Sequence, residues 1–459
     1  MKKILTIAGL TWKSAFRYRL FWVITALLVA SVVGLPMVLV DDGTAKGLTQ
    51  ILLTYTLTAV ATLLGFVTLW LSCATLAKDV EECQMQVVAV KPIARWQIWI
   101  GKWLGILSLN AALLALSGAA IFILLHWRAS RLPAEQQAIL HKEIFVARAE
   151  ARTPQHDFTP EVNEVIRERF KTFDSMSESD QYEIRQQITE GIKAGYTEVG
   201  PGYRRRWGVD LHTLQDRLRN QPLVLRVKFH TANPNPDAQY SSIWIVGPTN
   251  SSAQVAIPEK LPPDSYQEIT IPPNMLDDHG ILWVDVFNPE DTALTFPLDD
   301  GFVLLYPEST FGVNFVRGMT VIFCWLALLA SIGLATASYL SFPVATFASL
   351  ALLVMGLSSG TVSTVVENGT IMGFDSAKST YGHSPTDYVM VPFFKGALKV
   401  IKLVENFSPI DALSSGRSIT WGDLGLAVAQ IILLLGGFFS VLGIIFFTRR
   451  ELATAQGTS

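Results

Sequence analysis

The chain has 459 residues, of which 50% are hydrophobic and 16% charged, whereas about 25% of the residues in an average soluble protein are charged. Its formal net charge at pH 7 is -3 and no long basic run occurs, which excludes an ordinary soluble enzyme, a disordered chain and a protein that binds nucleic acid. Of the 36 basic and 39 acidic residues, 18 and 27 lie between residues 128 and 312. The composition therefore predicts an integral membrane protein that carries a soluble insert.

The first predicted element is an amphipathic helix over residues 4–19 that lies on the membrane surface. Apolar residues fall near one face, and the basic side chains of Lys13, Arg17 and Arg19 can reach the lipid headgroups. A secretory signal peptide fits less well, because the basic segment is long and no small-residue cleavage site follows the apolar run cleanly.

Six apolar runs without internal charge come next, each long enough to cross a hydrocarbon core of about 30 Å as a helix. They comprise residues 20–40, 51–77, 103–125, 318–340, 343–366 and 424–447. A buried helix of a soluble protein would explain any single run, but six together favour membrane spans. The predicted fold is thus an α-helical polytopic membrane protein with six transmembrane helices. No Asp, Glu, Lys or Arg within the runs marks an ion or proton relay.

Basic residues near short loops predict the orientation of these spans. They occur in the N-terminal segment, in the loop 78–102 and at Arg449 and Arg450, which all lie on one side if the chain crosses six times. We therefore expect a cytoplasmic (inner) membrane location, with both termini in the cytoplasm and residues 127–314 outside. One loop opposes this assignment, because basic residues also occur in the outer segment 367–423. They are Lys378, Lys395, Lys399, Lys402 and Arg417.

Most of those residues lie far from the span ends, where the rule loses force. The path of this loop stays open at the sequence level. Its stretch 393–407 is amphipathic and is expected to lie on the outer leaflet or to dip into it.

The sequence divides into four regions. Residues 1–126 hold the interfacial helix and the first three spans, and residues 315–459 hold the last three and a cytoplasmic tail. Between them we expect a large extracytoplasmic α+β insert, with a helical region over residues 127–222 and a β-sandwich or jelly-roll-like region over residues 223–314.

Within the insert, the pattern changes from helical spacing to alternation. Helical spacing covers 134–152, 159–173 and 177–196, with Thr159 as a possible N-cap and Pro160 at the first helical position. Alternation of period two then predicts about seven short strands. These strands comprise residues 223–232, 241–247, 253–258, 267–272, 281–288, 292–297 and 302–307. Short strands separated by turn residues favour an antiparallel sandwich.

Three side-chain groups were weighed as binding sites. Trp207, Trp244 and Trp283 suit a sugar-binding platform, although core positions are the stronger interpretation for aromatic residues in strands. The run 204–206 of three arginines could meet acidic headgroups, but a solvated loop is the simpler interpretation. The three cysteines and seven histidines show no metal-ligand spacing.

The loop 78–102, KDVEECQMQVVAVKPIARWQIWIGK, is the most informative segment. It predicts a charged helix from Lys78 to about residue 90, ended by Pro92, and a second amphipathic segment from about Ile93. Three tryptophans of the second segment are expected at the membrane interface. These are Trp96, Trp99 and Trp103. The loop is either a reinforced membrane hairpin or a docking surface for a cytosolic partner, with Glu81, Glu82, Lys91 and Arg95 exposed.

The order of residues in this loop carries a family resemblance. Pro92, Arg95, Gly101 and Lys102 match the latter half of a pattern E-x-G-T, apolar residues, P-x-[ST]-R, apolar residues, G-K. The loop thus resembles the cytoplasmic hairpin of ABC transporter permeases of the type-2 exporter class. It departs from the pattern where Cys83 and Gln84 replace Gly-Thr and where Ala94 replaces the common serine.

The stretch NFSPIDAL at residues 406–413 is similar to a motif before the last span in such permeases. Permeases for copper-enzyme maturation and for gliding motility are similar in the spans. The resemblance covers about 270 residues of the membrane part and leaves out the insert.

The resemblance implies a permease subunit of an ATP-driven transporter, most simply an exporter, that is not itself an enzyme. The sequence has no G-x-x-x-x-G-K-[ST] motif for binding nucleotide phosphates. A separate cytosolic ATP-binding subunit would bind ATP and magnesium, so this chain needs no cofactor and no metal. Two permease chains, identical or different, would assemble with two ATPases in the lipid bilayer. The residues expected to couple the permease to its ATPase are Glu81, Glu82, Lys91, Pro92, Arg95, Gly101 and Lys102.

In the expected mechanism, closure of the ATPase subunits pushes on the loop 78–102, and the neighbouring spans transmit the push to an apolar or amphipathic cargo. The alternative is a membrane-anchored sensor or assembly factor whose external domain binds a ligand, a protein or a glycan. An intramembrane enzyme has little support, since the spans hold no catalytic constellation.

Overall fold

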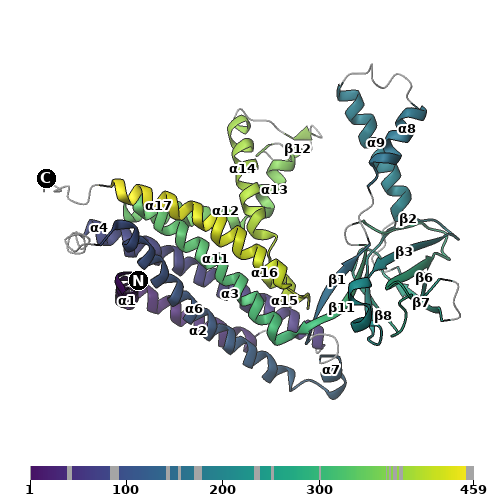
Figure 1. Ribbon diagram of the computed structural model, residues 1–459, viewed down its shortest axis with the longest axis horizontal. Helices are drawn as coiled ribbons and strands as arrows, with labels where there is room; N and C mark the ends of the chain where they lie inside the picture. Colours follow the sequence, from purple (N-terminus) through teal and green to yellow (C-terminus); the bar gives the residue numbers. More distant parts are fainter. Residues whose placement is uncertain are drawn as a thin grey trace. The chain divides into compact units, whose positions relative to one another are not determined.

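The computed structural model describes most of the chain. The described residues are 2–38, 44–82, 93–140, 145–153, 157–169, 178–231, 238–249, 253–298, 301–368, 370–371, 374–375, 380–381 and 386–450. They fall into two compact units (Figure 1). The helical unit comprises Met1–Ala147 with Ser309–Ser459, and the insert unit comprises Arg148–Glu308.

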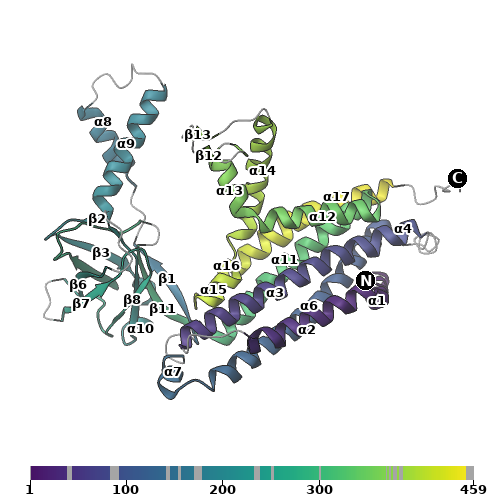
Figure 2. The same ribbon diagram turned by 180° about the vertical axis from the view of Figure 1, so that it is seen from behind.

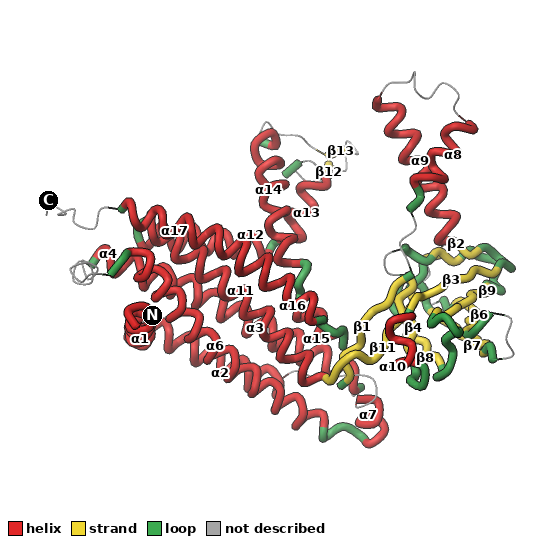
Figure 3. The backbone as a smooth tube through the Cα atoms, viewed as in Figure 1, coloured by secondary structure: helices red, strands yellow, loops and turns green. Residues whose placement is uncertain are grey.

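The helical unit contains almost only helices (Figure 3). Its N-terminal half comprises α1 (Lys2–Arg17), α2 (Arg19–Val38), α3 (Ala45–Cys73), the π-helical turn η1 (Ala74–Lys78), α4 (Asp79–Glu81), α6 (Arg95–Ala129) and α7 (Ala134–Ile139). Its C-terminal half comprises α11 (Phe311–Tyr339), α12 (Phe342–Leu357), α13 (Ser359–Asn368), β12 (Phe374–Asp375), β13 (Thr380–Tyr381), α14 (Asp387–Glu405), α15 (Pro409–Ser414), α16 (Trp421–Ala427), the π-helical segment η5 (Val428–Gly436) and α17 (Gly437–Arg449).

Five helices of the described residues are long and apolar enough to cross a membrane. They are Arg19–Val38, Gly47–Glu81, Arg95–Ala129, Phe311–Tyr339 and Trp421–Arg449. A sixth crossing exists only if Phe342–Leu357 and Ser359–Val366, which meet at a bend of 71°, count as one span. The predicted span 343–366 is therefore broken at Ser358. Serine and glycine neighbours favour such a kink, and here Ser358, Ser359 and Gly360 follow one another. The helix content and the five or six apolar helices are those of a multi-pass membrane protein.

The predicted amphipathic helix at the N-terminus is confirmed as α1, which packs on α6. A Cβ atom added to Gly101 would lie 2.7 Å from Ile7 Cβ, and one added to Gly105 would lie 2.7 Å from Thr11 Cβ. Two glycines four residues apart share one helix face and let two helix backbones approach closely. Part of the apolar face of α1 is thus used for packing against α6.

The insert unit is built on antiparallel sheets. The strands are β1 (Val146–Arg152), β2 (Glu198–Val199), β3 (Arg204–Asp210), β4 (Leu223–Val227), β5 (His230–Thr231), β6 (Tyr240–Val246), β7 (Val255–Leu261), β8 (Gln267–Ile271), β9 (Ile281–Phe287), β10 (Leu294–Thr295) and β11 (Phe302–Thr310). Two four-stranded sheets have the orders β1-β11-β4-β8 and β3-β9-β6-β7, and a third has the order β2-β10-β5. Every strand expected from the alternation after residue 223 is present.

Both four-stranded sheets contribute to a single core. Leu225 and Ile269 from one sheet and Trp244 and Val284 from the other belong to the same buried cluster. The alternating burial along β4 and β6 points one face of each strand into this core. Apolar alternation in the sequence is therefore what holds the two sheets together.

Two expectations for the first part of the insert are wrong. Of the described residues within 134–152, only α7 forms a helix of several residues, and residues 146–152 form β1, where Ala147 and Ala149 are buried. Alanine and charged residues alternate there, and pairing with β11 overrides their helix propensity. Residues 204–210, expected within a helical and looped region, form β3 and pair with β9. The other two predicted helices are confirmed as α8 (Thr159–Arg169) and α9 (Glu178–Thr197), while α10 (Gln215–Leu218) is a single turn.

Candidate functional site

The residues expected to couple the chain to a partner border the segment 83–92. Glu81 and Glu82 stand at its start, and Arg95 begins α6 after it. Gly101 and Lys102 lie further along α6. Lys91 and Pro92 lie outside the described residues, as do Cys83 and Gln84. Figure 1 shows this end of the helical unit, near α4, the end of α17 and the N-terminus.

Lys102 joins α6 to the end of α3. Its side chain is buried, and Nζ donates to Asp79 Oδ2 at 2.5 Å and also to the Thr75 carbonyl. A buried ammonium group is tolerated only when it is paired and hydrogen-bonded. Thr75 belongs to the π-helical turn η1 and Asp79 to α4, so this one side chain fixes the place where α3 ends.

Arg95 joins the start of α6 to the end of α17. Its Nη1 donates to the carbonyls of Phe447 at 3.0 Å, Thr448 at 2.8 Å and Arg450 at 2.7 Å. The last carbonyls of a helix lack partners within the helix and carry partial negative charge. A guanidinium at this position satisfies them, so Arg95 caps α17 from a helix that lies far away in the sequence.

Arg450 makes the same kind of cap on α11. Its Nη1 donates to the carbonyls of Ala337 at 3.1 Å, Ser338 at 3.4 Å and Leu340 at 3.4 Å. Sequence reasoning used Arg450 only to orient the spans and missed this contact. The two arginines form a chain from α6 through α17 to α11.

Glu81 reaches the start of α12. Its Oε1 accepts a hydrogen bond from the Phe342 backbone N–H at 2.7 Å, a favourable place for a carboxylate because helix N-termini carry partial positive charge. Lys78 Nζ lies 4.6 Å from the centre of the Phe342 ring and 5.3 Å from that of Tyr18. Both contacts have cation–π geometry.

Tyr18 connects this region to the junction of α1 and α2. Burial raises the pKa of its hydroxyl group, and the nearby negative charges of Asp79 and Glu82 raise it further. A hydrogen bond with Ser14 acts in the opposite direction but is outweighed. The Tyr18 hydroxyl group therefore stays protonated and uncharged. The Tyr18 ring packs edge-on against Trp70, with ring centroids 5.1 Å apart.

Six charged residues thus tie together the ends of five helical segments. We call them the helix-end cluster: Lys78, Asp79, Glu81, Arg95, Lys102 and Arg450. The segments joined are the α3–α4 end, the start of α6, the end of α11, the start of α12 and the end of α17. Arg95 is half-buried and Lys102 is buried, whereas Glu81 and Glu82 are exposed. The arrangement suits transmission of force between helices.

The three tryptophans of this region differ in their surroundings. Trp96 is 46% exposed, whereas Trp99 is fully buried and donates from Nε1 to Ser338 Oγ at 3.3 Å. A Cβ atom on Gly443 would lie 2.9 Å from Trp99 Nε1, so α17 lacks a side chain where the ring packs. The expectation of an interfacial Trp99 is wrong. Trp103 is half-buried and donates to the Ala327 carbonyl.

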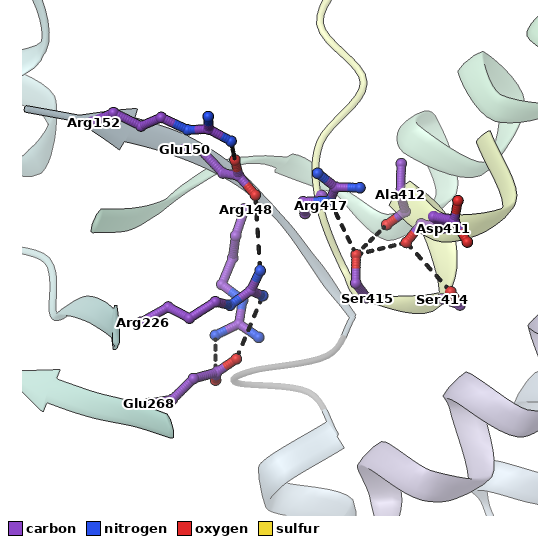
Figure 4. A network of polar contacts seen from close by, with 10 residues as sticks. All are labelled: Arg148, Glu150, Arg152, Arg226, Glu268, Asp411, Ala412, Ser414, Ser415 and Arg417. Carbon is purple, nitrogen blue, oxygen red and sulfur yellow. Dashed lines mark hydrogen bonds and ion pairs between the residues drawn. The ribbon is translucent and has the colours of Figure 1, made fainter. Parts of the chain in front are cut away.

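The segment 406–413, the second part of the resemblance, lies at the opposite end of the helical unit. Asp411 and Ser415 form local hydrogen bonds at the end of α15 (Figure 4). Asn314, in the first turns of α11, donates to the Arg417 carbonyl at 2.7 Å and accepts from the Ile419 N–H at 2.8 Å. Arg317 donates to the Ile419 carbonyl at 2.9 Å. These bonds hold the start of the last long helix against the start of α11.

The arginine run of the insert unit is not a free basic patch. Arg204 and Arg206 both donate to the carboxylate of Asp285, whose side chain is 3% exposed, and Arg205 donates to the Gly195 carbonyl. Burial alone would raise the pKa of the Asp285 carboxyl group, but hydrogen bonds from Arg206 and Arg204 and their charges lower it. The expected loop is wrong, because these residues form β3, whereas Arg204 and Arg206 are exposed to solvent as expected.

The tryptophans of the insert unit lie mainly in its core. Trp244 is fully buried, and Phe296 contacts both its ring and that of Trp207. Trp283 is half-buried and donates from Nε1 to Asp277 Oδ2 at 2.9 Å. The core interpretation describes Trp244 and Trp207 better than a shared sugar platform does.

Among the described residues, no group of three or more His, Cys, Asp or Glu side chains could hold a metal ion. Comparison with protein-family models, with curated proteins and with solved structures gave no match.

Proposed function

We propose that this chain is the permease subunit of an ATP-driven ABC transporter of the type-2 exporter class. It would export an apolar or amphipathic cargo across the cytoplasmic membrane. A separate subunit would bind ATP and magnesium and hydrolyse the nucleotide. The proposal rests on the match of Pro92, Arg95, Gly101 and Lys102 to the hairpin of such permeases and on the contacts that the described members of this set make.

One observation carries the proposal furthest: Arg95, which stands directly after the segment 83–92 in α6, caps α17 with three hydrogen bonds. Arg450 extends this connection to α11. A push on the segment 83–92 would therefore reach the ends of α6, α17 and α11 together. Such a rigid connection is what coupling between an ATPase and a transport pathway requires.

The proposed topology has six crossings with both termini in the cytoplasm and the insert unit outside. Contacts of Glu81 with Phe342 and of Asn314 with Ile419 mark the two ends of the helical unit. The chain passes from the first end at Phe342 to the second end at Ile419 through α12, α13 and α14. In the proposed topology this passage is the fifth crossing, and the last long helix, which ends with α17, then crosses back to the end that holds α1.

The assembly would contain two permease chains, either two copies or two related chains, and two ATPase subunits. The exposed Glu81 and Glu82 would face the ATPase together with the segment 83–92. The helix-end cluster would lie behind them and receive the motion.

Purification of the full-length chain from the membranes of its own host tests this proposal. We expect a nucleotide-binding subunit to co-purify and to hydrolyse ATP. Glu82→Lys should reduce its recovery, since this change reverses a charge on the proposed contact surface. Glu164→Lys, on α8 of the insert unit, is the matched control. Recovery of the intact chain without any ATP-binding subunit contradicts the proposal.

A second candidate function is that of a membrane-anchored sensor or assembly factor, and the separate core of the insert unit favours it. Such an insert would bind a protein or a glycan outside the cell. Under this alternative the chain purifies without an ATPase, and deletion of the insert unit abolishes binding of the external ligand.

A further inference from the structure

A cavity of about 800 Å³ lies in the helical unit between α11, α12, α14 and the η5–α17 helix. Its volume is within the range of about 300–1,000 Å³ that ligand sites occupy. Its walls are almost entirely apolar and include Leu329 and Ile332 of α11, Leu353 of α12 and Phe439 of α17. We call it the α14 cavity. Figure 2 shows α13 and α14 beside each other above the long helices.

The helix α14 has two unlike faces. Phe393, Gly396, Ala397, Val400, Ile401 and Val404 line the cavity. Lys395, Lys399 and Lys402 are exposed, and their spacing of four and three residues places them on one helix face. At 100° per residue this lysine face is opposite the cavity face. An amphipathic helix of this kind lies between lipid headgroups and acyl chains, with the cavity on the acyl side.

The cavity is open toward the apolar surroundings of the helices. Phe393 is 57% exposed, Val400 45%, Leu352 41% and Leu357 64%, and all four line the cavity. In a bilayer these side chains would contact acyl chains, so a lipid chain can enter from the side.

One end of the cavity is polar. Glu405, the last residue of α14, lines it and accepts a hydrogen bond from Ser359 Oγ at 3.1 Å. A carboxylate at this end complements a headgroup that carries an ammonium group.

The cavity wall also contains a polar group that has no partner among the described residues. The indole N–H of Trp325 is buried and makes no hydrogen bond with the described residues. Buried donors in native proteins nearly always have an acceptor. A ligand with an oxygen between its polar head and its apolar chain would supply one, as the ester of a phospholipid does.

We propose that the α14 cavity binds one acyl chain of a phospholipid with a phosphoethanolamine headgroup. The lipid ammonium pairs with Glu405, and an ester oxygen accepts from Trp325. The inference requires only that these helices lie in a bilayer and is independent of the proposed transport function.

Photolabelling of the full-length protein in lipid vesicles tests the site. The probes are phosphatidylethanolamine and phosphatidylglycerol that carry the same photoactivatable acyl chain. We expect the ethanolamine lipid to label α11, α12 and α14 and unlabelled phosphatidylethanolamine to compete. Labelling spread evenly over all apolar helices would overturn the proposal.

Filling the cavity gives a sharper test. Gly396 and Gly356 line the cavity, and a Cβ atom on either meets no atom within 4 Å, so Gly396→Leu and Gly356→Leu each place a side chain in the cavity. Both should abolish labelling of α14. Gly425→Leu, at a glycine of α16 that is equally open and does not line the cavity, should leave it unchanged. Persistent labelling in both cavity variants contradicts the site.

A substitution of Glu405 tests the assignment of the lipid headgroup. Glu405→Gln should lower the preference for phosphatidylethanolamine over phosphatidylglycerol by about tenfold, the effect of losing one hydrogen bond to a charged group. Lys395→Gln, on the lysine face, should not change this preference. Equal labelling by both lipids in the unmodified protein would overturn the headgroup assignment. Cross-linking between copies through Phe393→Cys, with no lipid labelling, would show a second chain in place of the lipid.

Discussion

The two units of the chain differ in the groups that their arginine side chains bind. In the helical unit, Arg95, Arg317 and Arg450 donate to main-chain carbonyls near helix ends. In the insert unit, Arg204 and Arg206 on a strand pair with the carboxylate of Asp285. Arg205, which donates to the Gly195 carbonyl near the end of α9, follows the pattern of the helical unit. The difference follows from the backbone. Carbonyls at the end of a helix have no partner, whereas those inside a strand ladder are already bonded.

The insert unit also carries a ladder of charges across the β1–β11–β4–β8 sheet (Figure 4). Arg148 pairs with Glu268 at 3.1 Å, and Arg226 lies between Glu268 at 3.6 Å and Glu150 at 3.8 Å. Arg152 extends the ladder with a contact to Glu150 at 3.0 Å. Alternation of side chains places these residues of β1 on the face opposite Ala147 and Ala149.

Helix-end carbonyls let the helical unit hold buried and half-buried cations, such as Arg317 and Arg95, with few acidic partners. A guanidinium that binds helix-end carbonyls needs no carboxylate in apolar surroundings. Lys102 is the exception, since it uses both the Thr75 carbonyl and Asp79.

The largest effect is expected from Asp79→Leu. It leaves the Lys102 ammonium buried beside a single carbonyl, and such an unpaired charge costs about 3–5 kcal/mol. Thermal unfolding of the full-length protein in detergent measures the loss. Addition of Lys102→Met should restore most of it. Equal stability of the single and double variants would show that the pair is not buried in solution.

Removal of the Asp285 carboxylate should cost about 2–3 kcal/mol, since both arginines lose charged hydrogen bonds. Asp285→Asn keeps the size of the side chain and removes its charge. Hydrogen exchange of β3 and β9 in the full-length protein reports the change locally. Exchange in the helical unit serves as the control, and unchanged protection of both strands would refute the role of this carboxylate.

Smaller effects are expected at the helix-end arginines. Arg95→Gln or Arg450→Gln should each destabilise the protein by about 0.5–2 kcal/mol, the range for a partly buried cation at a helix C-terminus. Arg95 donates a hydrogen bond to the Arg450 carbonyl. The stability lost in the double variant should therefore differ from the sum of the losses in the two single variants. Thermal unfolding of both single variants and the double variant measures this coupling. Strict additivity would contradict a connected chain of caps.

The smallest effect is a pH dependence confined to the insert unit. The folded-state pKa of Asp285 is below its ordinary value of 3.8, so its ionised form stabilises the fold at pH values above 3.8. That contribution declines below pH 3.8 and is lost as the pH falls through the folded pKa. Hydrogen exchange of β9 between pH 5 and pH 3 should show this decline, and Asp285→Asn should remove it. An equal decline in the variant would assign the effect to other groups.

Local patterns predicted the elements that depend on local residues. Alternation of period two identified the strands after residue 223, and amphipathic spacing identified α1, α8 and α9. The strand β1 was missed because alanine and charged residues suit a helix as well. The bend at Ser358 was missed because apolar residues continue on both sides of it.

Contacts between distant residues had no local signature. Arg95 and the α17 carbonyl of Phe447 are 352 residues apart, and Arg204 and Asp285 are 81 apart. The only sign of the Arg450 cap in the sequence is that two basic residues, Arg449 and Arg450, follow the last apolar run. Of the expected coupling residues, the structure connects Glu81, Arg95 and Lys102 to neighbouring helices, while the partner that they would serve remains a proposal.

The most direct test of the account is the ATPase activity of the complex purified with the full-length chain. We predict that a nucleotide-binding subunit is present and that Arg95→Gln and Arg450→Gln both lower the ATPase rate while leaving subunit recovery unchanged. Arg167→Gln, at an exposed position of α8, should leave the rate as it is. Absence of an ATP-binding subunit, or a rate insensitive to both helix-end variants, would contradict the claim that the helix-end cluster couples ATP hydrolysis to transport.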